Sequence, residues 1–87
     1  MLDELDKVIL AAAYDGIEVS PGQRVAGSTV WESVRASLPD IAPVTVPARL
    51  RRLVSHKLLE KDESNSSNRT KLYGPTEAGR QLWLARQ

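Results

Sequence analysis

Two short segments with the composition of β-strands flank a polar run in the C-terminal half of the chain. The run, residues 64–68, contains only serine and asparagine; residues 58–61 precede it, and residues 69–73, which alternate in polarity, follow it. A run of this composition cannot bury itself and favours a turn. The pattern therefore predicts one β-hairpin with a flexible polar tip.

The N-terminal segment is predicted to be a helix. Apolar residues recur there at helical spacing, and acidic residues occupy the opening turn, where the helix dipole favours negative charge. We expect this helix to end at Gly16, because glycine accepts the left-handed conformation that closes a helix. Residues 17–27 are interrupted by a Pro-Gly turn and are compatible with a short strand, but the sequence assigns them no role.

A second, short helix is predicted over residues 29–38. Thr29 and Glu32 fit a capping box, with Ser28 as a competing cap, and Pro39 stops the helix. The turn that follows is tight, and its Ile41 is expected to plug the core.

A third helix is predicted from a cap at Thr45 to about Lys57. Pro47 suits its first turn, where the missing N–H would have no partner anyway. One apolar stripe runs along this helix and consists of Val46, Leu50, Leu53 and Val54. The short second helix, the tight turn and the amphipathic third helix together predict a helix-turn-helix.

Beyond the hairpin, Gly74 and Pro75 are expected to end the second strand, and Thr76 to cap a last helix that extends through Leu84. With 87 residues the chain forms a single domain, residues 1–87. Three helices, a hairpin and a short C-terminal helix define an α+β fold, mainly α. They are the elements of a winged helix-turn-helix, with the hairpin as the wing.

Composition narrows the function classes. The chain has no cysteine and one histidine, and it shows no metal-ligand cluster, no glycine-rich phosphate loop and no evident nucleophile. We therefore expect no enzyme activity, no cofactor and no metal. The longest apolar stretch, residues 8–13, is too short to cross a bilayer, and the N-terminus lacks the features of a secretory signal. We expect a cytoplasmic protein without a membrane partner.

Charge is unevenly distributed although the net charge is only +1. Residues 1–18 carry a net charge of −4 and residues 45–61 a net charge of +4. Such an asymmetry builds a positive face on a nearly neutral body, and a solvated helix flank is the plainer explanation of the same pattern.

The outward side of the third helix has the composition of a DNA-binding surface. With 100° per residue, the side opposite the apolar stripe presents Thr45, Ala48, Arg52 and Ser55, flanked by Arg49, Arg51 and His56. Small residues let a helix approach a groove closely, and a central arginine can bind guanine, while flanking cations suit phosphates.

On the hairpin, Arg69 and Lys71 can reach a minor groove or the phosphates beside it. Several of the candidate residues also have a plainer explanation, although Arg52, at the centre of the outward side, is the hardest to explain in that way. Arg49 and Arg51 could pair with acids such as Glu60, and Thr45 could be a cap only.

Two stretches resemble a known family. Residues 45–53, followed by 58–61, resemble the recognition helix and first wing strand of MarR- and PadR-like regulators. Residues 69–80 resemble the second wing strand and the threonine-acid-any-glycine start of the next helix. The resemblance implies a winged helix, DNA binding by the third helix and the wing, and a homodimer. Those families carry long terminal helices for dimerisation, which the short last helix here does not match.

The leading hypothesis is a bacterial or phage transcription regulator, such as a repressor, that binds double-stranded DNA sequence-specifically and is associated with the nucleoid. The alternative is a winged helix that binds only protein, but an adaptor would not need arginines gathered on one face. Leu82, Trp83 and Leu84 are adjacent and cannot all face one core, so a homodimer is predicted.

Overall fold

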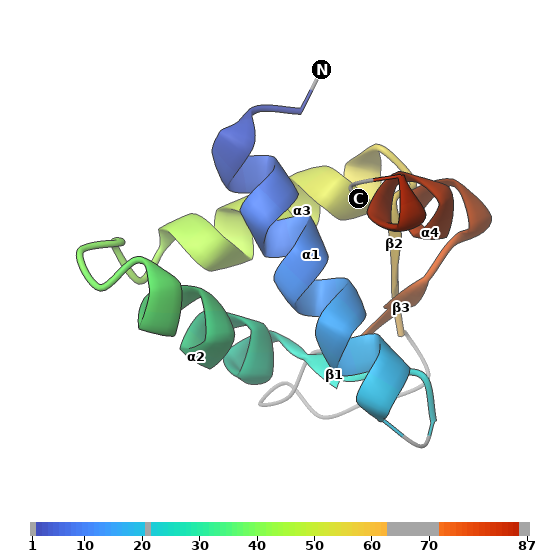
Figure 1. Cartoon of the computed structure of the whole chain (residues 1–87), viewed down its shortest axis with the longest axis horizontal. Coiled ribbons are helices and arrows are strands. Elements are labelled where there is room, and N and C mark those ends of the chain that lie inside the picture. Colours follow the sequence, from blue (N-terminus) through green and yellow to red (C-terminus); the bar gives the residue numbers. More distant parts are fainter. Residues whose placement is uncertain (1, 21, 63–71, 86–87) are drawn as a thin grey trace.

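The computed structural model describes residues 2–20, 22–62 and 72–85 (Figure 1). Along the chain lie α1 (Glu4–Val19), β1 (Val25–Ala26), α2 (Gly27–Ser37), α3 (Thr45–Ser55), β2 (Leu59–Lys61), β3 (Leu72–Pro75) and α4 (Glu77–Leu84). The succession of three helices, two antiparallel strands and a final helix confirms the predicted fold class. β1 is the short strand with which residues 17–27 were compatible.

The core lies around α1, which crosses in front of α3 in Figure 1 and contacts α2, α3 and α4. Hydrophobic burial holds the three-helix unit together, and Ile9, Ala13 and Ile17 of α1 have no exposed surface. The stripe predicted for the third helix is buried at Val46, Leu50 and Leu53, while Val54 and Ile41 pack against the core from its edge. The opposite side of α3 therefore faces outward.

The sheet has three antiparallel strands in the order β1–β3–β2, with β3 in the centre. Tyr73 of β3 pairs with Val25 of β1 and with Lys61 of β2. The segment between the first two helices thus supplies the third strand of the wing sheet. Sequence patterns do not reveal the role of this segment, because the pairing joins residues that lie far apart along the chain.

Contrary to prediction, the second hairpin strand does not stop before Gly74 and Pro75, but includes both residues and ends at Pro75. They belong to β3, where Gly74 pairs with Glu60 and Pro75 with Leu59. Proline is tolerated at a strand terminus. Glycine leaves room for the side chain of Arg24, since a Cβ at Gly74 would lie 2.7 Å from Arg24 Nη1.

Gly16 does not end α1 either, because the helix continues to Val19. A Cβ on Gly16 would lie 2.6 Å from Cγ2 of Val25, so the glycine permits the close approach of β1 to α1. The extra turn fully buries Ile17. That burial contributes about 1.5–3 kcal/mol and outweighs the roughly 1 kcal/mol that glycine costs inside a helix.

The predicted caps of the second and third helices are wrong. α2 begins at Gly27, directly after β1, and its N-cap is Ala26, whose backbone stays extended and forms no side-chain cap hydrogen bond. α3 is preceded by Val44, whose helical backbone takes the cap position and leaves Thr45 in the first turn. In both cases the incoming chain, fixed by strand pairing or by the preceding turn, sets the start of the helix.

α3 ends at Ser55, two residues before the predicted end, and Lys57 adopts the left-handed conformation with φ 61°. The Leu58 N–H donates to the Leu53 carbonyl and the Lys57 N–H to the Val54 carbonyl, each at 2.9 Å. These are the two bonds of a Schellman ending, with lysine at the position where glycine is usual. The ending turns the chain from α3 into β2.

Thr76 caps α4 as predicted, and it also anchors the helix. Its Oγ1 accepts the N–H of Gly79 at 3.0 Å and its hydroxyl donates to the Lys57 carbonyl at 2.7 Å. The fully buried hydroxyl of Tyr14 donates to the Leu58 carbonyl at 2.7 Å and accepts the Thr76 N–H at 3.1 Å. One side chain of α1 thereby joins the end of α3, the start of β2 and the start of α4.

Candidate nucleic-acid interface

The outward side of α3 carries most of the predicted contact residues in exposed positions. Those exposed are Ala48, Arg51, Arg52, Ser55 and His56, whereas Thr45 and Arg49 are half-buried. Their placement follows from the buried stripe, which fixes the rotation of the helix about its axis.

Arg49 is held by two carboxylates of the N-terminal segment. Its Nη1 donates to Asp3 Oδ2 at 2.6 Å and to Asp6 Oδ1 at 3.1 Å. Both are charge-assisted hydrogen bonds, which are shorter and stronger than neutral ones. Pairing of Arg49 with an acid agrees with the plainer sequence-based explanation, but the acids are Asp3 and Asp6 and not Glu60.

Arg52 also lies beside α1, because its Nε is 3.3 Å from Asp6 Oδ2. The side chain of Arg52 is 45% exposed, whereas that of Asp6 has no exposed surface. A buried carboxylate requires a charged partner to offset its lost hydration. Arg49 and Arg52 supply this compensation and fasten the first turns of α1 to α3.

The contact between Asp3 and Arg49 shifts the pKa of both groups. The pKa of the Asp3 carboxyl lies below its ordinary value of 3.8, first because it accepts the Asp6 backbone N–H and then because it accepts Arg49. The pKa of Arg49 is raised, chiefly by its hydrogen bond to Asp3. A lowered carboxyl pKa stabilises the fold above the unfolded value, and this contribution is lost as pH falls through the folded pKa. The contact is therefore fully formed at neutral pH.

Arg51 lies on the other flank of α3. With 100° per residue it points about 200° away from Arg49 around the helix, and its charge acts on Tyr73 of β3. Burial raises the pKa of the Tyr73 phenol above 10.0, and the nearby Arg51 lowers it in part. Arg49 and Arg52 thus face α1, whereas Arg51 lies on the opposite flank of α3 and is close enough to Tyr73 for its charge to act on it.

Arg24 is a cation of the wing sheet that the sequence interpretation did not include. It directly precedes β1, its guanidinium lies across Gly74, and its Nε is 3.7 Å from Asp62 Oδ2. The side chain of Arg24 is 40% exposed. No local pattern marks it, because its position depends on the pairing of β1 with β3.

The wing residues Arg69 and Lys71, and the polar tip between the strands, lie outside the described residues. The base of the hairpin is described, and there the Asp62 N–H donates to the Leu72 carbonyl at 2.8 Å. The contact predicted for Arg69 and Lys71 therefore stays a prediction.

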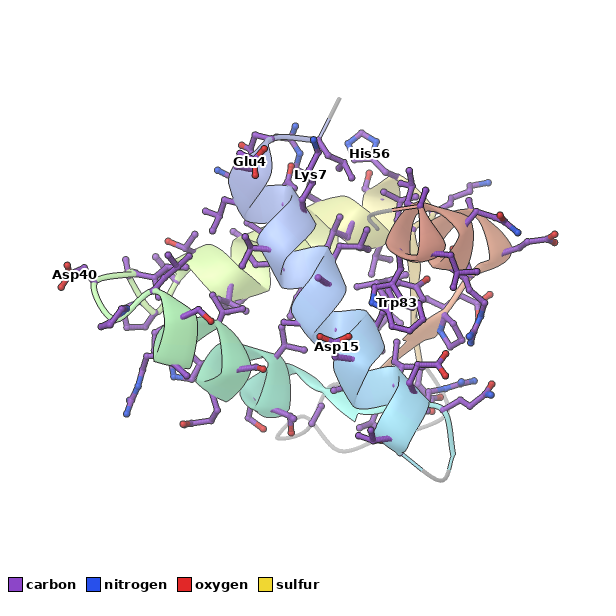
Figure 2. The ribbon with its side chains drawn as sticks, viewed as in Figure 1. Glu4, Lys7, Asp15, Asp40, His56 and Trp83 are labelled. Carbon is purple, nitrogen blue, oxygen red and sulfur yellow. The ribbon has the colours of Figure 1, made fainter. Side chains whose placement is uncertain are left out.

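A second surface lies between α1 and α4. The rings of Tyr14 and Trp83 stack with centroids 5.9 Å apart, Trp83 Nε1 donates to Asp15 Oδ1 at 3.2 Å, and Arg80 pairs with Glu18. Figure 2 shows Trp83 and Asp15 side by side.

Beside the stack is a groove of about 350 Å³, lined by Leu2, Lys7, Leu10, Ala11, Leu82, Trp83 and Ala85. Leu82 and Leu84 are 45% and 53% exposed.

Within the described ranges, none of the helices has the length and apolar character needed to cross a membrane. The same part of the chain holds no group of three histidine, aspartate or glutamate side chains placed to bind a metal ion.

No protein-family model matches the sequence, and no curated protein matches it at a significant level. Solved structures do match. RosR from H. salinarum superposes with a TM-score of 0.77 at 20% identity, over 97% of this chain and 69% of that one. BpsR from Bordetella bronchiseptica superposes with a TM-score of 0.69 at 26% identity, over 97% of this chain and 51% of that one. F93 from STIV, a winged-helix DNA-binding protein, superposes with a TM-score of 0.65 at 16% identity, over 98% of this chain and 86% of that one. The chain has the winged-helix fold.

Proposed function

We propose that this winged-helix chain binds double-stranded DNA sequence-specifically and regulates transcription, with α3 in the major groove and the wing on the adjacent backbone or minor groove. The observation that carries the proposal is the outward side of α3, where small and basic side chains stand opposite a stripe that is buried at Val46, Leu50 and Leu53. F93 is a DNA-binding protein, and BpsR has a DNA-binding activity that 6-hydroxynicotinic acid regulates. The narrower likeness to MarR- and PadR-like regulators and a role as repressor stay predictions.

The exposed residues divide into two kinds. Ala48 and Ser55 are small, which permits close approach to base edges. Arg51 is exposed and its charge acts on Tyr73 of the sheet, and Arg24, which is 40% exposed and pairs with Asp62, adds a second cation on that sheet. Positive charge on both elements suits a duplex that contacts helix and wing together. A regulator of this kind would act on the nucleoid in the cytoplasm.

The test is a salt titration of binding to a random-sequence duplex, followed by selection of a preferred site. Binding of the wild type is expected to fall steeply between about 50 and 200 mM salt. Arg51→Ala should weaken binding and reduce the slope of log K against log salt by about one. Arg80→Ala is the matched control, because it removes the same charge from α4, where Arg80 pairs with Glu18, and the slope should not change.

Absence of binding at the lowest salt would contradict the proposal and favour a winged helix that binds only protein. Equal effects of Arg51→Ala and Arg80→Ala would mean that binding follows net charge and that α3 is not the contact surface.

We also propose that the chain forms a homodimer through α1 and α4. Leu82 lines the groove beside Trp83, and with Leu84 it leaves apolar surface exposed at the end of α4. Such a surface is typical of a contact between two copies. Leu82→Glu is expected to shift the sedimentation equilibrium from dimer to monomer. Leu38→Glu, at a comparably exposed leucine at the end of α2, should not. A monomeric wild type at tens of micromolar would contradict the dimer.

A further inference from the structure

Two carboxylates of the N-terminal segment lie against α3, the helix that is proposed to bind DNA. Asp3 and Asp6 both bond to Arg49 Nη1, and Asp6 also lies beside Arg52. A carboxylate and a phosphate present the same kind of anionic oxygen to a guanidinium. Any DNA phosphate that approaches Arg49 therefore competes with an acid of the same chain.

The two acids differ in how firmly they are held. The side chain of Asp6 has no exposed surface, whereas that of Asp3 is 53% exposed and that of Arg49 is 26% exposed. Exposed ion pairs contribute little to stability and exchange readily with solvent ions. Asp3 is thus the displaceable partner of Arg49, and Asp6 is the fixed one.

We propose that Asp3 is an intramolecular competitor of DNA phosphate at Arg49, which DNA has to displace before this arginine can bind the backbone. The inference rests on the proposed DNA-binding function and adds a means of regulating it. A ligand, a modification or a partner that withdraws the N-terminal turn from α3 would raise DNA affinity without altering any DNA-contacting residue.

The geometry of Asp3 allows the competition to be isolated. Its Oδ1 accepts the backbone N–H of Asp6 at 2.8 Å and caps α1, while its Oδ2 accepts Arg49. Asparagine is as good an N-cap as aspartate. Asp3→Asn therefore keeps the cap and removes the charge that competes with phosphate.

Glu4→Gln is the matched control. Glu4 lies in the same turn of α1, labelled in Figure 2, and is exposed. It forms no ion pair with any residue in the described ranges. Both substitutions raise the net charge by one, so general attraction to DNA rises equally in the two variants.

The experiment measures the Kd for one duplex at constant salt for the wild type and both variants. Asp3→Asn is expected to bind about two- to fivefold more tightly than Glu4→Gln, the range that an exposed ion pair supports. In an Arg49→Gln background the difference between the two substitutions should vanish. If Arg49→Gln does not fold, as circular dichroism would show, the comparison of the single variants decides the question.

The outcomes separate this inference from the function on which it rests. If the wild type binds DNA and the two single variants have the same affinity, the competition is contradicted and the proposed function stands. If neither the wild type nor Asp3→Asn binds DNA, both are contradicted. If only Asp3→Asn binds, both are supported, since the wild-type acid then blocks the site.

Discussion

Replacement of Gly79 with alanine is expected to lower the free energy of unfolding by about 3 kcal/mol, the upper end of the range for overpacked sites. A Cβ at this position would lie 1.9 Å from the Leu58 carbonyl oxygen and 2.1 Å from the Tyr14 hydroxyl. The first is a backbone atom that cannot turn aside. Native domains have a total stability of about 5–15 kcal/mol, so a loss of about 3 kcal/mol removes a large part of it and should clearly lower the unfolding midpoint in urea.

The measurement is urea denaturation followed by far-ultraviolet circular dichroism. Gly22→Ala is the matched control, since a Cβ on Gly22 meets no atom of the described residues within 4 Å and its φ is not in the left-handed region. The free energy of unfolding of that variant should equal the wild-type value or exceed it slightly, because alanine lowers the conformational entropy of the unfolded chain. Wild-type stability of Gly79→Ala would show that α4 does not start as close to β2 as described.

Tyr14→Phe is expected to lower the free energy of unfolding by about 2 kcal/mol. The substitution keeps the ring that stacks on Trp83 and removes only the hydroxyl. It leaves the Leu58 carbonyl and the Thr76 N–H without this partner in a buried place. Buried polar groups that lose their partner carry the full desolvation penalty, which is why the effect exceeds that of an average hydrogen bond.

Tyr73→Phe serves as the comparison for Tyr14→Phe. Tyr73 is also a core tyrosine, but its hydroxyl forms no hydrogen bond with a residue in the described part of the chain. Its removal should therefore change the unfolding midpoint in urea very little. Equal midpoints for the two variants would assign no special role to the Tyr14 hydroxyl.

Together these two sites explain the threonine-acid-any-glycine sequence at residues 76–79. Thr76 caps α4 and bonds to the Lys57 carbonyl, and Gly79 lets the first turn of the helix lie against the Leu58 carbonyl. The motif thus connects the start of α4 to the chain segment that follows α3. Its presence in the sequence therefore supports the fold and does not by itself argue for DNA binding.

Local patterns were sufficient to predict most of the elements. The apolar stripe of α3, the cap at Thr76 and the stop before Pro39 are set by residues that are neighbours on one helix, so sequence spacing reveals them. The prediction failed where a distant contact overrode a local preference. α1 continues past Gly16 because the extra turn buries Ile17, and Thr45 is not a cap because the preceding turn has already set the backbone at Val44.

The candidate site was predictable in composition but not in detail. Helical periodicity placed Arg52 and Ser55 outward, and both are exposed. The partners of Arg49 and Arg52 could not be foreseen, since no spacing rule brings residues 3 and 6 beside α3. The uneven charge along the chain was the available signal: the acidic segment and the basic helix partly neutralise each other.

The pairing of β1 with β3 has a consequence for how the chain folds. It joins Val25 to Tyr73 and so closes a loop that contains α2, α3 and β2. Closing a long loop costs chain entropy before the contacts at its ends form and stabilise the structure, and this cost slows folding. A chain that is mostly helical should therefore fold more slowly than a simple helical bundle of equal length. The sheet, although its described strands are short, would form late and complete the wing only after the helices have packed.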